Sequence, residues 1–240
     1  LVQKSNWVTC TQGSRFEKDI VTLLDIPKEK LYNLPIGIAS IDEILSRPFI
    51  TDEQAKRVWG FEGKYVIVIG YNGSPAHNHI KVIKSLVFMK KQLPTNTILV
   101  CPMTYGGNPV YRKKIKRLLW NSQFENQILE NYLTAEELVC LRKATDLFIH
   151  AQNTDANSGT IAEYLLCRKK IVNPTWITYP HYETYGSPFY SFSNFEELPQ
   201  AIMKAINDTS NKVSPLLTGN ISESGWSKLA CKWVELYKKY

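Results

Sequence analysis

The feature that most constrains this chain is a buried strand that ends at a glycine and leads into a helix. Residues Tyr65–Ile69 form a continuous run of aromatic and β-branched side chains, and Gly70 follows directly. Unbroken apolar runs of this kind are typical of strands covered on both faces, as in parallel sheets. After a loop rich in turn-forming residues, apolar side chains recur at helical spacing from Ile80 to Val87. The pattern therefore predicts a strand, a glycine-containing turn and a helix that runs to about Lys91.

The same unit recurs along the chain, which predicts an α/β domain with a Rossmann-like parallel sheet flanked by helices. We expect further strands at 97–101, 126–130, 146–150, 170–172 and 188–192. We expect further helices at 110–120, 134–144 and 158–167, and one that Asn194 caps and that ends at 206. Thr134 followed by Glu137 is a capping-box pattern at the start of one of these helices. Ligands of parallel sheets bind outside the carboxyl ends of the strands, so the site is expected in the loops 70–79, 102–109, 150–159 and 173–187.

The outer segments are less regular than this central α/β region, which we place at 63–207. Residues 1–38 are predicted as a strand (7–11), a helix (14–24) and a strand (30–35), and 39–62 as a linker with a short helix near 52–58. The remainder, 208–240, is predicted as a loop and a closing helix. That helix carries one apolar stripe, which needs a covering partner: Trp226, Leu229, Ala230, Trp233, Val234 and Tyr237. Since the chain begins with Leu1 and no secretion signal follows, we expect it to begin inside a larger protein.

Charge and composition limit the classes of partner. The net charge of +7 is compatible with nucleic acid, an anionic membrane surface or phosphorylated small molecules. The densest basic run, Arg112–Arg117, falls in a predicted helix, where a solvated face is the ordinary explanation. No zinc-finger, RRM or helix-turn-helix spacing is present, so we expect no nucleic-acid partner. The five scattered cysteines and the lack of an apolar run of roughly 18 residues indicate a cytoplasmic protein, with the inner face of a membrane left open.

The stretch after the strand predicted at 146–150 carries the side chains best suited to binding a ligand. The helix there opens with three small residues, Ser158, Gly159 and Thr160. Free N–H groups at a helix start attract phosphate. Glu163 lies one turn into the helix, where its carboxylate can accept hydrogen bonds from a ribose diol, and Asp155 precedes the helix, where it could hold sugar hydroxyls. Both acids also have ordinary interpretations, as a turn residue and as a first-turn helix charge, so the residues alone leave two alternatives open.

This stretch resembles the C-terminal domain of GT-B glycosyltransferases, above all the retaining enzymes of family 4. Those enzymes have a strand, a Glu, a small-residue turn, a second Glu after a gap of seven residues, and another strand. Here Asp155 stands in place of the first Glu, and the same gap leads to Glu163. The resemblance implies that Glu163 binds the ribose of the donor nucleotide and that Asp155 contacts the donor sugar. It extends, in weaker form, to residues 7–38, 134–146 and 224–237. The resemblance implies that residues 63–207 form the nucleotide-sugar-binding domain and that residues 1–38 are a remnant of the N-terminal GT-B domain.

The resemblance implies a retaining hexosyltransferase that takes a nucleotide-diphosphate sugar as substrate. The acceptor would be a saccharide or a lipid-linked molecule, and neither a metal nor a cofactor would take part. Two alternatives stay open, a nucleotide-sugar 2-epimerase of the same fold and a binding or scaffold domain without catalysis. The acceptor site would lie in an N-terminal domain, so we expect this chain alone to bind the donor but to transfer little. No catalytic residue is assigned.

The loop after the first strand departs from the family pattern. The family usually carries an Arg and a Lys there to clamp the diphosphate, whereas 70–79 contains neither. We expect Gly70, Asn72, His77 and backbone N–H groups to take their place, with His79 as a further candidate. Two histidines two residues apart could also suggest a metal, but no third ligand lies nearby in the sequence.

Two further loops are expected near the donor. Thr104 is a candidate contact, and its loop, Thr104–Gly107, resembles that of lipid-linked fucosamine transferases of the GT-B group, although a simple turn is the more ordinary explanation of the two glycines. In the loop 173–187 aromatic residues are crowded together: Trp176, Tyr179, His181, Tyr182 and Tyr185. Their rings could line the cleft by stacking on bases and sugars, or they could form a hydrophobic lid or an interdomain contact.

Overall fold

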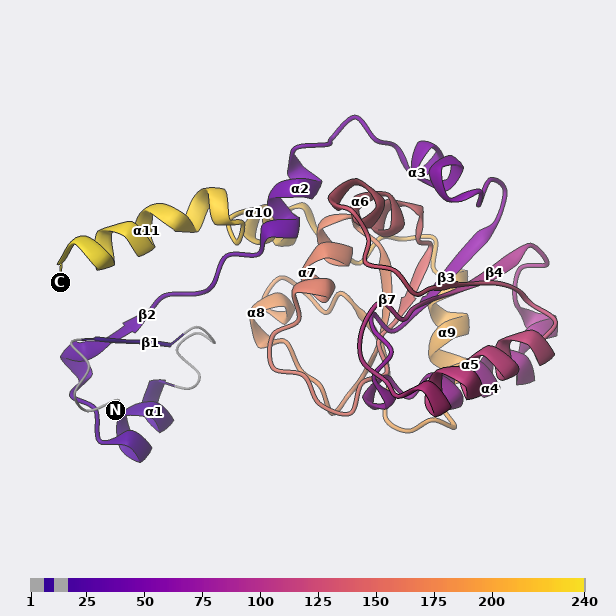
Figure 1. The fold of residues 1–240 in the computed structure, drawn as a ribbon, viewed down its shortest axis with the longest axis horizontal. Coiled ribbons are helices and arrows are strands. Elements are labelled where there is room, and N and C mark those ends of the chain that lie inside the picture. Colours follow the sequence, from indigo (N-terminus) through magenta and orange to yellow (C-terminus); the bar gives the residue numbers. More distant parts are fainter. Residues whose placement is uncertain (1–6, 11–16, 240) are drawn as a thin grey trace.

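A six-stranded parallel sheet forms the centre of the computed structural model, which describes residues 7–10 and 17–239 (Figure 1). Its strands are β3 (Tyr65–Ile69), β4 (Thr97–Pro102), β5 (Glu125–Leu129), β6 (Leu147–Ile149), β7 (Lys170–Pro174) and β8 (Phe189–Phe192). They lie in the order β5-β4-β3-β6-β7-β8. The chain therefore builds the sheet outward from β3 in one direction and from β6 in the other. Doubly wound sheets bind their ligands at the point where this direction reverses.

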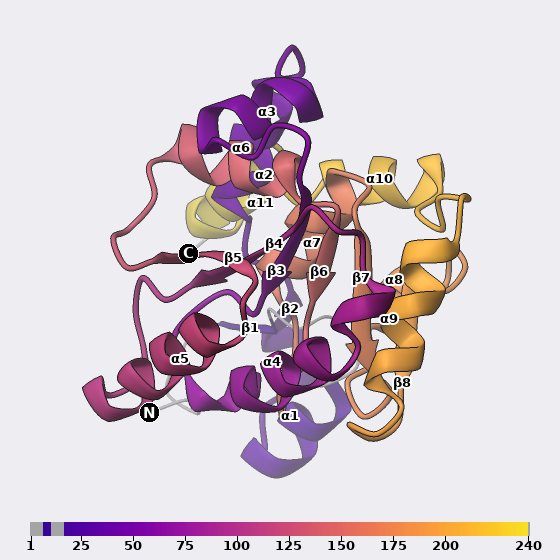
Figure 2. The same cartoon turned by 90° about the vertical axis from the view of Figure 1, so that its right-hand side faces the viewer.

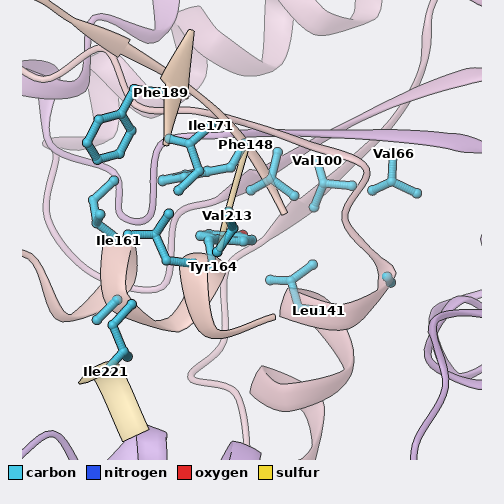
Figure 3. Close-up of a cluster of buried hydrophobic side chains, with 14 of the residues drawn as sticks. Val66, Val100, Leu141, Phe148, Ile161, Tyr164, Ile171, Phe189, Val213 and Ile221 are labelled. Carbon is cyan, nitrogen blue, oxygen red and sulfur yellow. The ribbon is translucent and has the colours of Figure 1, made fainter. Parts of the chain in front are cut away.

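Helices cover both faces of the sheet (Figure 2). One face carries α4 (His79–Phe88), α5 (Pro109–Asn121) and α9 (Leu198–Asn207), and the other carries α2 (Ala39–Leu45), α6 (Ala135–Ala144), α7 (Gly159–Leu166) and α10 (Pro215–Ser222). Because side chains alternate along a strand, Ile67 and Ile69 enter the first core, and Val66 and Val68 enter the second. Figure 3 shows the second core, where Phe148 and Tyr164 stack with their ring centroids 4.1 Å apart.

The predicted Rossmann-like class is confirmed, and each predicted strand and helix of the sheet domain is present within a few residues of its expected bounds. The capping box is confirmed as well, because Thr134 N donates to Glu137 Oε2 at 2.8 Å and Glu137 N donates to Thr134 Oγ1 at 3.2 Å. The predicted cap of α9 is wrong. Asn194 Oδ1 accepts from the backbone N–H of Glu196 and of Glu197, both at 3.1 Å, and so closes a turn that precedes the helix.

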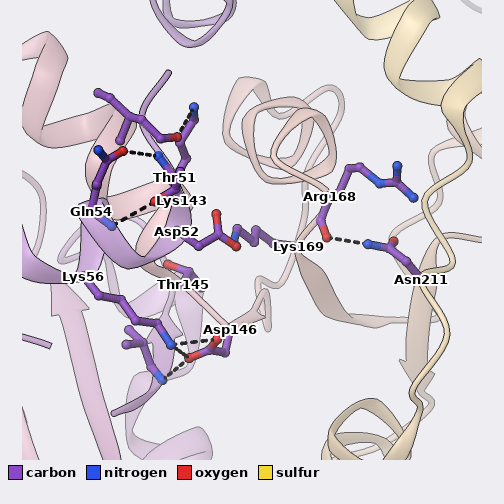
Figure 4. Close-up of polar contacts among 12 residues, drawn as sticks. Thr51, Asp52, Gln54, Lys56, Lys143, Thr145, Asp146, Arg168, Lys169 and Asn211 are labelled. Atoms are coloured by element: carbon purple, nitrogen blue, oxygen red, sulfur yellow. Dashed lines mark hydrogen bonds and ion pairs between the residues drawn. The ribbon is translucent and has the colours of Figure 1, made fainter. Parts of the chain in front are cut away.

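Residues 39–62, predicted as a linker with one short helix, hold two helices that pack on the sheet domain. The first, α2, buries two isoleucines, and the second is α3 (Asp52–Trp59). Lys56 Nζ donates to both carboxylate oxygens of Asp146, at 2.7 and 3.0 Å, and Lys169 pairs with Asp52 (Figure 4). These contacts join the segment to the starts of β6 and β7. The exact domain boundaries stay a prediction.

The N-terminal residues and the C-terminal helix lie together, away from the main sheet (Figure 1). Strands β1 (Val8–Cys10) and β2 (Leu31–Asn33) pair in parallel, and α1 (Glu17–Leu24) connects to them. The predicted closing helix is α11 (Trp226–Lys239). Trp233 Nε1 donates to Pro35 O at 3.0 Å, and the rings of Trp7 and Tyr237 meet edge-on at 5.4 Å. The apolar stripe of α11 is therefore partly covered by the N-terminal segment. The first residues of the helix predicted at 14–24 lie outside the described residues.

Two loops at the carboxyl edge of the sheet touch through their backbones. Gly73 N donates to Tyr105 O at 2.7 Å, and a Cβ atom on Gly107 would lie 2.1 Å from Gly73 O. Gly107 also has φ +68°, a conformation that side chains disfavour. The close approach of the two loops thus explains why glycine occupies this position.

We expect Gly107→Ala to lower the free energy of unfolding by about 1–3 kcal/mol, because the added methyl group forces the two loops apart. Urea unfolding followed by circular dichroism measures this change. Gly63→Ala is the matched control, since Gly63 has φ +67° but open space around the added atom. If both variants lose the same stability, the loop contact is not what requires glycine at 107.

Among residues 7–10 and 17–239, no helix is long and apolar enough to cross a bilayer.

Candidate functional site

A pocket of about 240 Å³ opens at the carboxyl edge of the sheet, between the loops after β3, β4 and β5 and the helices α6 and α7. It is lined by Tyr71, Pro102, Thr104, Tyr105, Tyr132, Leu133, Leu138, Leu141, Arg142, Thr160 and Glu163. The rings of Tyr105 and Tyr132 stack with centroids 6.1 Å apart, and both are exposed to solvent. The pocket therefore combines two solvent-exposed aromatic rings, an apolar wall of leucines and one pair of opposite charges.

Glu163 is held rigidly at the base of this pocket. Its side chain is 8% exposed, and Oε2 accepts from Arg142 Nε at 2.7 Å while Oε1 accepts from the hydroxyl of Ser40. A carboxylate has about four lone-pair positions, and these two bonds use two of them. Glu163 can therefore accept hydrogen bonds from a ligand that enters the pocket without giving up its internal partners.

Arg142 is a buried cation fixed behind Glu163. Its Nη1 donates to Tyr164 Oη at 3.0 Å, and its guanidinium lies 4.6 Å from the centre of the Tyr164 ring. Burial disfavours the charge, but Tyr164 and Glu163 outweigh it and hold the pKa of Arg142 above its ordinary value. Sequence reasoning missed both Arg142 and Ser40. The sequence does hold one indication for Arg142: it follows Val139 by three residues, which puts it on the apolar face of its helix.

The first turn of α7 presents free backbone donors beside Glu163. Ser158 is the N-cap of this helix, and its Oγ accepts from Ile161 N at 3.4 Å. The N–H groups of Gly159 and Thr160 donate to no acceptor within residues 7–10 and 17–239. Thr160 also lines the pocket. An anion in the pocket can therefore reach two free N–H groups at the positive end of the helix dipole.

Asp155 belongs to a separate, interior network. Its Oδ2 accepts from Tyr179 Oη at 2.8 Å and lies 3.4 Å from Nε2 of the buried His150. Burial alone would raise the pKa of Asp155, but the hydrogen bonds from His150 and Tyr179 outweigh it and hold this pKa below its ordinary value. His150 Nδ1 in turn meets Asn173 Oδ1 at 2.8 Å. Asp155 thus orders the loop before α7, and its contact with a donor sugar stays a prediction.

The two histidines after β3 lie in the interior and do not line the pocket. His77 is 1% exposed and neither ring nitrogen has a partner, whereas His79 Nδ1 lies 3.2 Å from Tyr111 Oη. Burial is the main cause that lowers the pKa of His77 to about 3 and that of His79 to about 4. Gly70 makes room for them, because a Cβ there would lie 3.0 Å from His79 Nε2. Both rings are therefore neutral near pH 7.

The structure brings together only part of the predicted donor site. The residues that line the pocket are Thr104, Thr160 and Glu163, and Ser158 and Gly159 form the helix start beside it. The residues outside the pocket lining are Gly70, Asn72, His77 and Asp155. Asn72 is 8% exposed, and its Oδ1 accepts from Ser74 N at 2.8 Å, so it shapes the loop.

Two other features bear on the predicted site. In the aromatic loop, Tyr179 and Tyr182 are buried core residues, which favours the hydrophobic alternative for that segment. Within residues 7–10 and 17–239, no group of three or more His, Cys, Asp or Glu side chains is placed to hold a metal ion. Metal independence stays a prediction.

The sheet domain has the fold of a C-terminal GT-B domain, and several of the solved structures that it resembles are glycosyltransferases. A glycosyltransferase from Rickettsia africae matches with a TM-score of 0.73 and 17% identity over 99% of this chain and 64% of that one. Anabaena HepE in complex with UDP and glucose matches with a TM-score of 0.73 and 15% identity over 98% of this chain and 64% of that one. This chain therefore spans about 64% of the length of these two proteins.

The C-terminal domain of a glycosyl transferase group 1 family protein from Francisella tularensis also matches, with a TM-score of 0.55 and 12% identity. That match covers 76% of this chain and 93% of the Francisella chain, which confirms that the sheet domain corresponds to a C-terminal GT-B domain. No family model and no curated protein matches the sequence.

Proposed function

We propose that this chain is the donor-binding part of a glycosyltransferase and holds a nucleotide-diphosphate sugar in the pocket at the carboxyl edge. The observation that carries the proposal is the pairing of Glu163, with its unused lone pairs, and the free N–H groups at the start of the same helix. A ribose whose diol binds Glu163 has its diphosphate one short linkage away, within reach of that helix start. The Anabaena protein HepE, which shares the fold, binds UDP and UDP-glucose.

The other walls of the pocket suit a nucleobase. Tyr105 and Tyr132 offer ring faces at the mouth, and the leucines of α6 and of the preceding loop offer an apolar wall. Aromatic faces stack on flat heterocycles, and such contacts are tolerant of the base. The choice among uracil, guanine and thymine therefore depends on polar groups at the pocket rim, such as Thr104.

Stabilisation of the leaving diphosphate falls to the helix start in this proposal. Among the described residues that line the pocket, Arg142 is the one cation, and Glu163 already neutralises it. Backbone N–H groups and the dipole of α7 then supply the positive field that the leaving group needs. The sugar would pass with retained configuration to a saccharide or lipid-linked acceptor.

Two alternatives rest on specific features. A nucleotide-sugar 2-epimerase shares the fold and the need for a ribose-binding Glu, and epimer formation without an acceptor would distinguish it. A binding or scaffold domain is favoured by the loop 70–79, which contains no Arg or Lys and whose histidines face the interior. Such a domain would bind the nucleotide sugar without turnover, even as part of a longer chain.

Calorimetric titration with UDP, GDP and dTDP tests the proposal. We expect one of the three diphosphates to bind, and its parent nucleoside to bind at least about tenfold more weakly, because the helix start recognises the phosphates. Thr160→Glu should weaken diphosphate binding by about tenfold through charge repulsion at the helix start, whereas Thr160→Gln should have little effect. Absence of heat with all three diphosphates and their sugars would reject the proposal.

A further inference from the structure

The positive charge of the chain is concentrated in one stretch. Residues 79–124 contain nine Lys or Arg and no Asp or Glu, which leaves 20 of the 29 cations and all 22 acids to the rest of the chain. The rest of the chain is therefore slightly negative, and the net charge of +7 arises from this stretch alone. It contains α4, β4 and α5, and its cations lie on or next to the two helices.

Most of these cations have no acidic partner. Glu130 pairs with Lys116 at 2.7 Å and lies 4.0 Å from Arg112, and it is the acid that contacts α5. Six exposed cations of α4, α5 and the turn after α4 have no carboxylate within 4.0 Å in the described part of the chain: Lys81, Lys84, Lys91, Lys113, Lys114 and Arg117. An excess of unpaired cations on one surface attracts an anionic partner.

Large apolar side chains protrude among these cations. Trp120 is 85% exposed, Phe88 82% and Val110 78%. Trp120 and Phe88 lie at the ends of α5 and α4, and those ends meet, because Lys90 Nζ donates to Gln123 O at 2.6 Å. Exposed apolar side chains that gather in one patch mark interaction sites, whereas scattered ones do not.

The protruding residues share one face of each helix. The side of α5 that faces the sheet carries the buried Ile115 and Leu119. The opposite side of the helix carries Val110, Lys113, Lys114, Arg117 and Trp120. On α4 the outward residues are Lys81, Lys84 and Phe88. The two helices lie side by side over the same face of the sheet in both views (Figures 1 and 2), so their outward sides form one surface. We call this surface, with Lys91, the α4–α5 face.

We propose that the α4–α5 face docks on a bilayer that contains anionic lipids. Cations that attract lipid headgroups and aromatic side chains that enter the interface are the two elements of peripheral membrane binding, and both lie on this face. The phosphate backbone of a nucleic-acid duplex would satisfy the cations but leave Phe88 and Trp120 in water. This inference goes beyond the proposed function, since nucleotide binding in the pocket does not depend on it.

Co-sedimentation with vesicles of phosphatidylcholine and 30% phosphatidylglycerol tests the proposal, with pure phosphatidylcholine vesicles as the neutral probe. We expect binding to the anionic vesicles only, and a loss with rising salt. Lys113→Gln with Arg117→Gln should weaken binding by about thirtyfold, at about fivefold for each cation. Trp120→Ser should weaken it by about tenfold, and Trp120→Phe should restore most of the loss.

Matched controls remove the same chemistry elsewhere. Lys228→Gln with Lys238→Gln removes two exposed cations from α11, and Leu216→Ser removes a residue of α10 that is 74% exposed. Binding that falls for the α4–α5 variants but not for these controls supports the proposal. It is overturned if the wild-type chain ignores the anionic vesicles, if both sets of variants fall alike, or if single-stranded poly(U) binds and vesicles do not. Circular dichroism and nucleotide titration of each variant check that the fold is retained.

Discussion

Replacement of Glu163 by Ala is expected to lower the free energy of unfolding by about 3–5 kcal/mol and to abolish nucleotide binding. The stability loss arises because the buried Arg142 keeps its charge and loses Glu163, the one carboxylate that pairs with it among residues 7–10 and 17–239. The binding loss arises because the ribose diol has no acceptor. Urea unfolding measures the first effect, and calorimetric titration with the diphosphate that binds the wild-type chain measures the second.

A double variant separates these two effects. Arg142→Met in the Glu163→Ala background removes the stranded charge, so it should recover much of the lost stability while binding stays absent. Glu136→Gln, an exposed change in the first turn of α6, is the control and should alter neither quantity. Nucleotide binding that returns in the stable double variant would show that Glu163 acts only as a partner of Arg142.

The second large effect is a loss of stability in mild acid. Burial holds the pKa of His77 at about 3 and that of His79 at about 4, against 6.5 for each in an unfolded chain. Between pH 6.5 and 4 the unfolded state therefore binds about two more protons than the folded state. The contribution of the two neutral histidines to the free energy of unfolding is fully present above pH 6.5 and falls by about 2.7 kcal/mol per pH unit below it. From pH 7.5 to pH 5 the free energy of unfolding therefore falls by about 4 kcal/mol. That is a large share of the stability of an ordinary domain.

His77→Phe tests the origin of this slope. The variant keeps an aromatic ring against Tyr71 and removes one titrating group whose two nitrogens have no partner. We expect the slope of unfolding free energy between pH 6.5 and 4.5 to fall by about 1.4 kcal/mol per pH unit, with equal or higher stability at pH 7.5. Urea unfolding at several pH values gives both quantities. An unchanged slope would mean that His77 does not stay neutral in the folded chain.

The sheet could be predicted from the sequence because its signals are local. The run Tyr65–Ile69 and the capping box at Thr134 each depend on neighbouring residues, and tertiary packing only reinforces them. Helix α2 escaped prediction because it lies outside the strand–helix repeat of the main sheet, and its burial depends on contacts with α7. Glu163 could be placed at a helix start from spacing alone.

The partners of the site residues depend on long-range contacts that spacing does not encode. Ser40 and Arg142 reach Glu163 from helices that are 123 and 21 residues away along the chain. His77 is typical of a phosphate ligand by residue type, but the turn after Gly70 points it into the core. The direction of a side chain in a loop is set by packing between loops, and the sequence of one loop does not specify it.

The most direct test of the donor site is a crystal structure of this chain with the nucleoside diphosphate that it binds. We predict the ribose hydroxyls within hydrogen-bond distance of Glu163, the diphosphate at the N–H groups of Gly159 and Thr160, and the base near Tyr105 and Tyr132. A nucleotide bound elsewhere, or a ribose that leaves Glu163 untouched, would contradict the account.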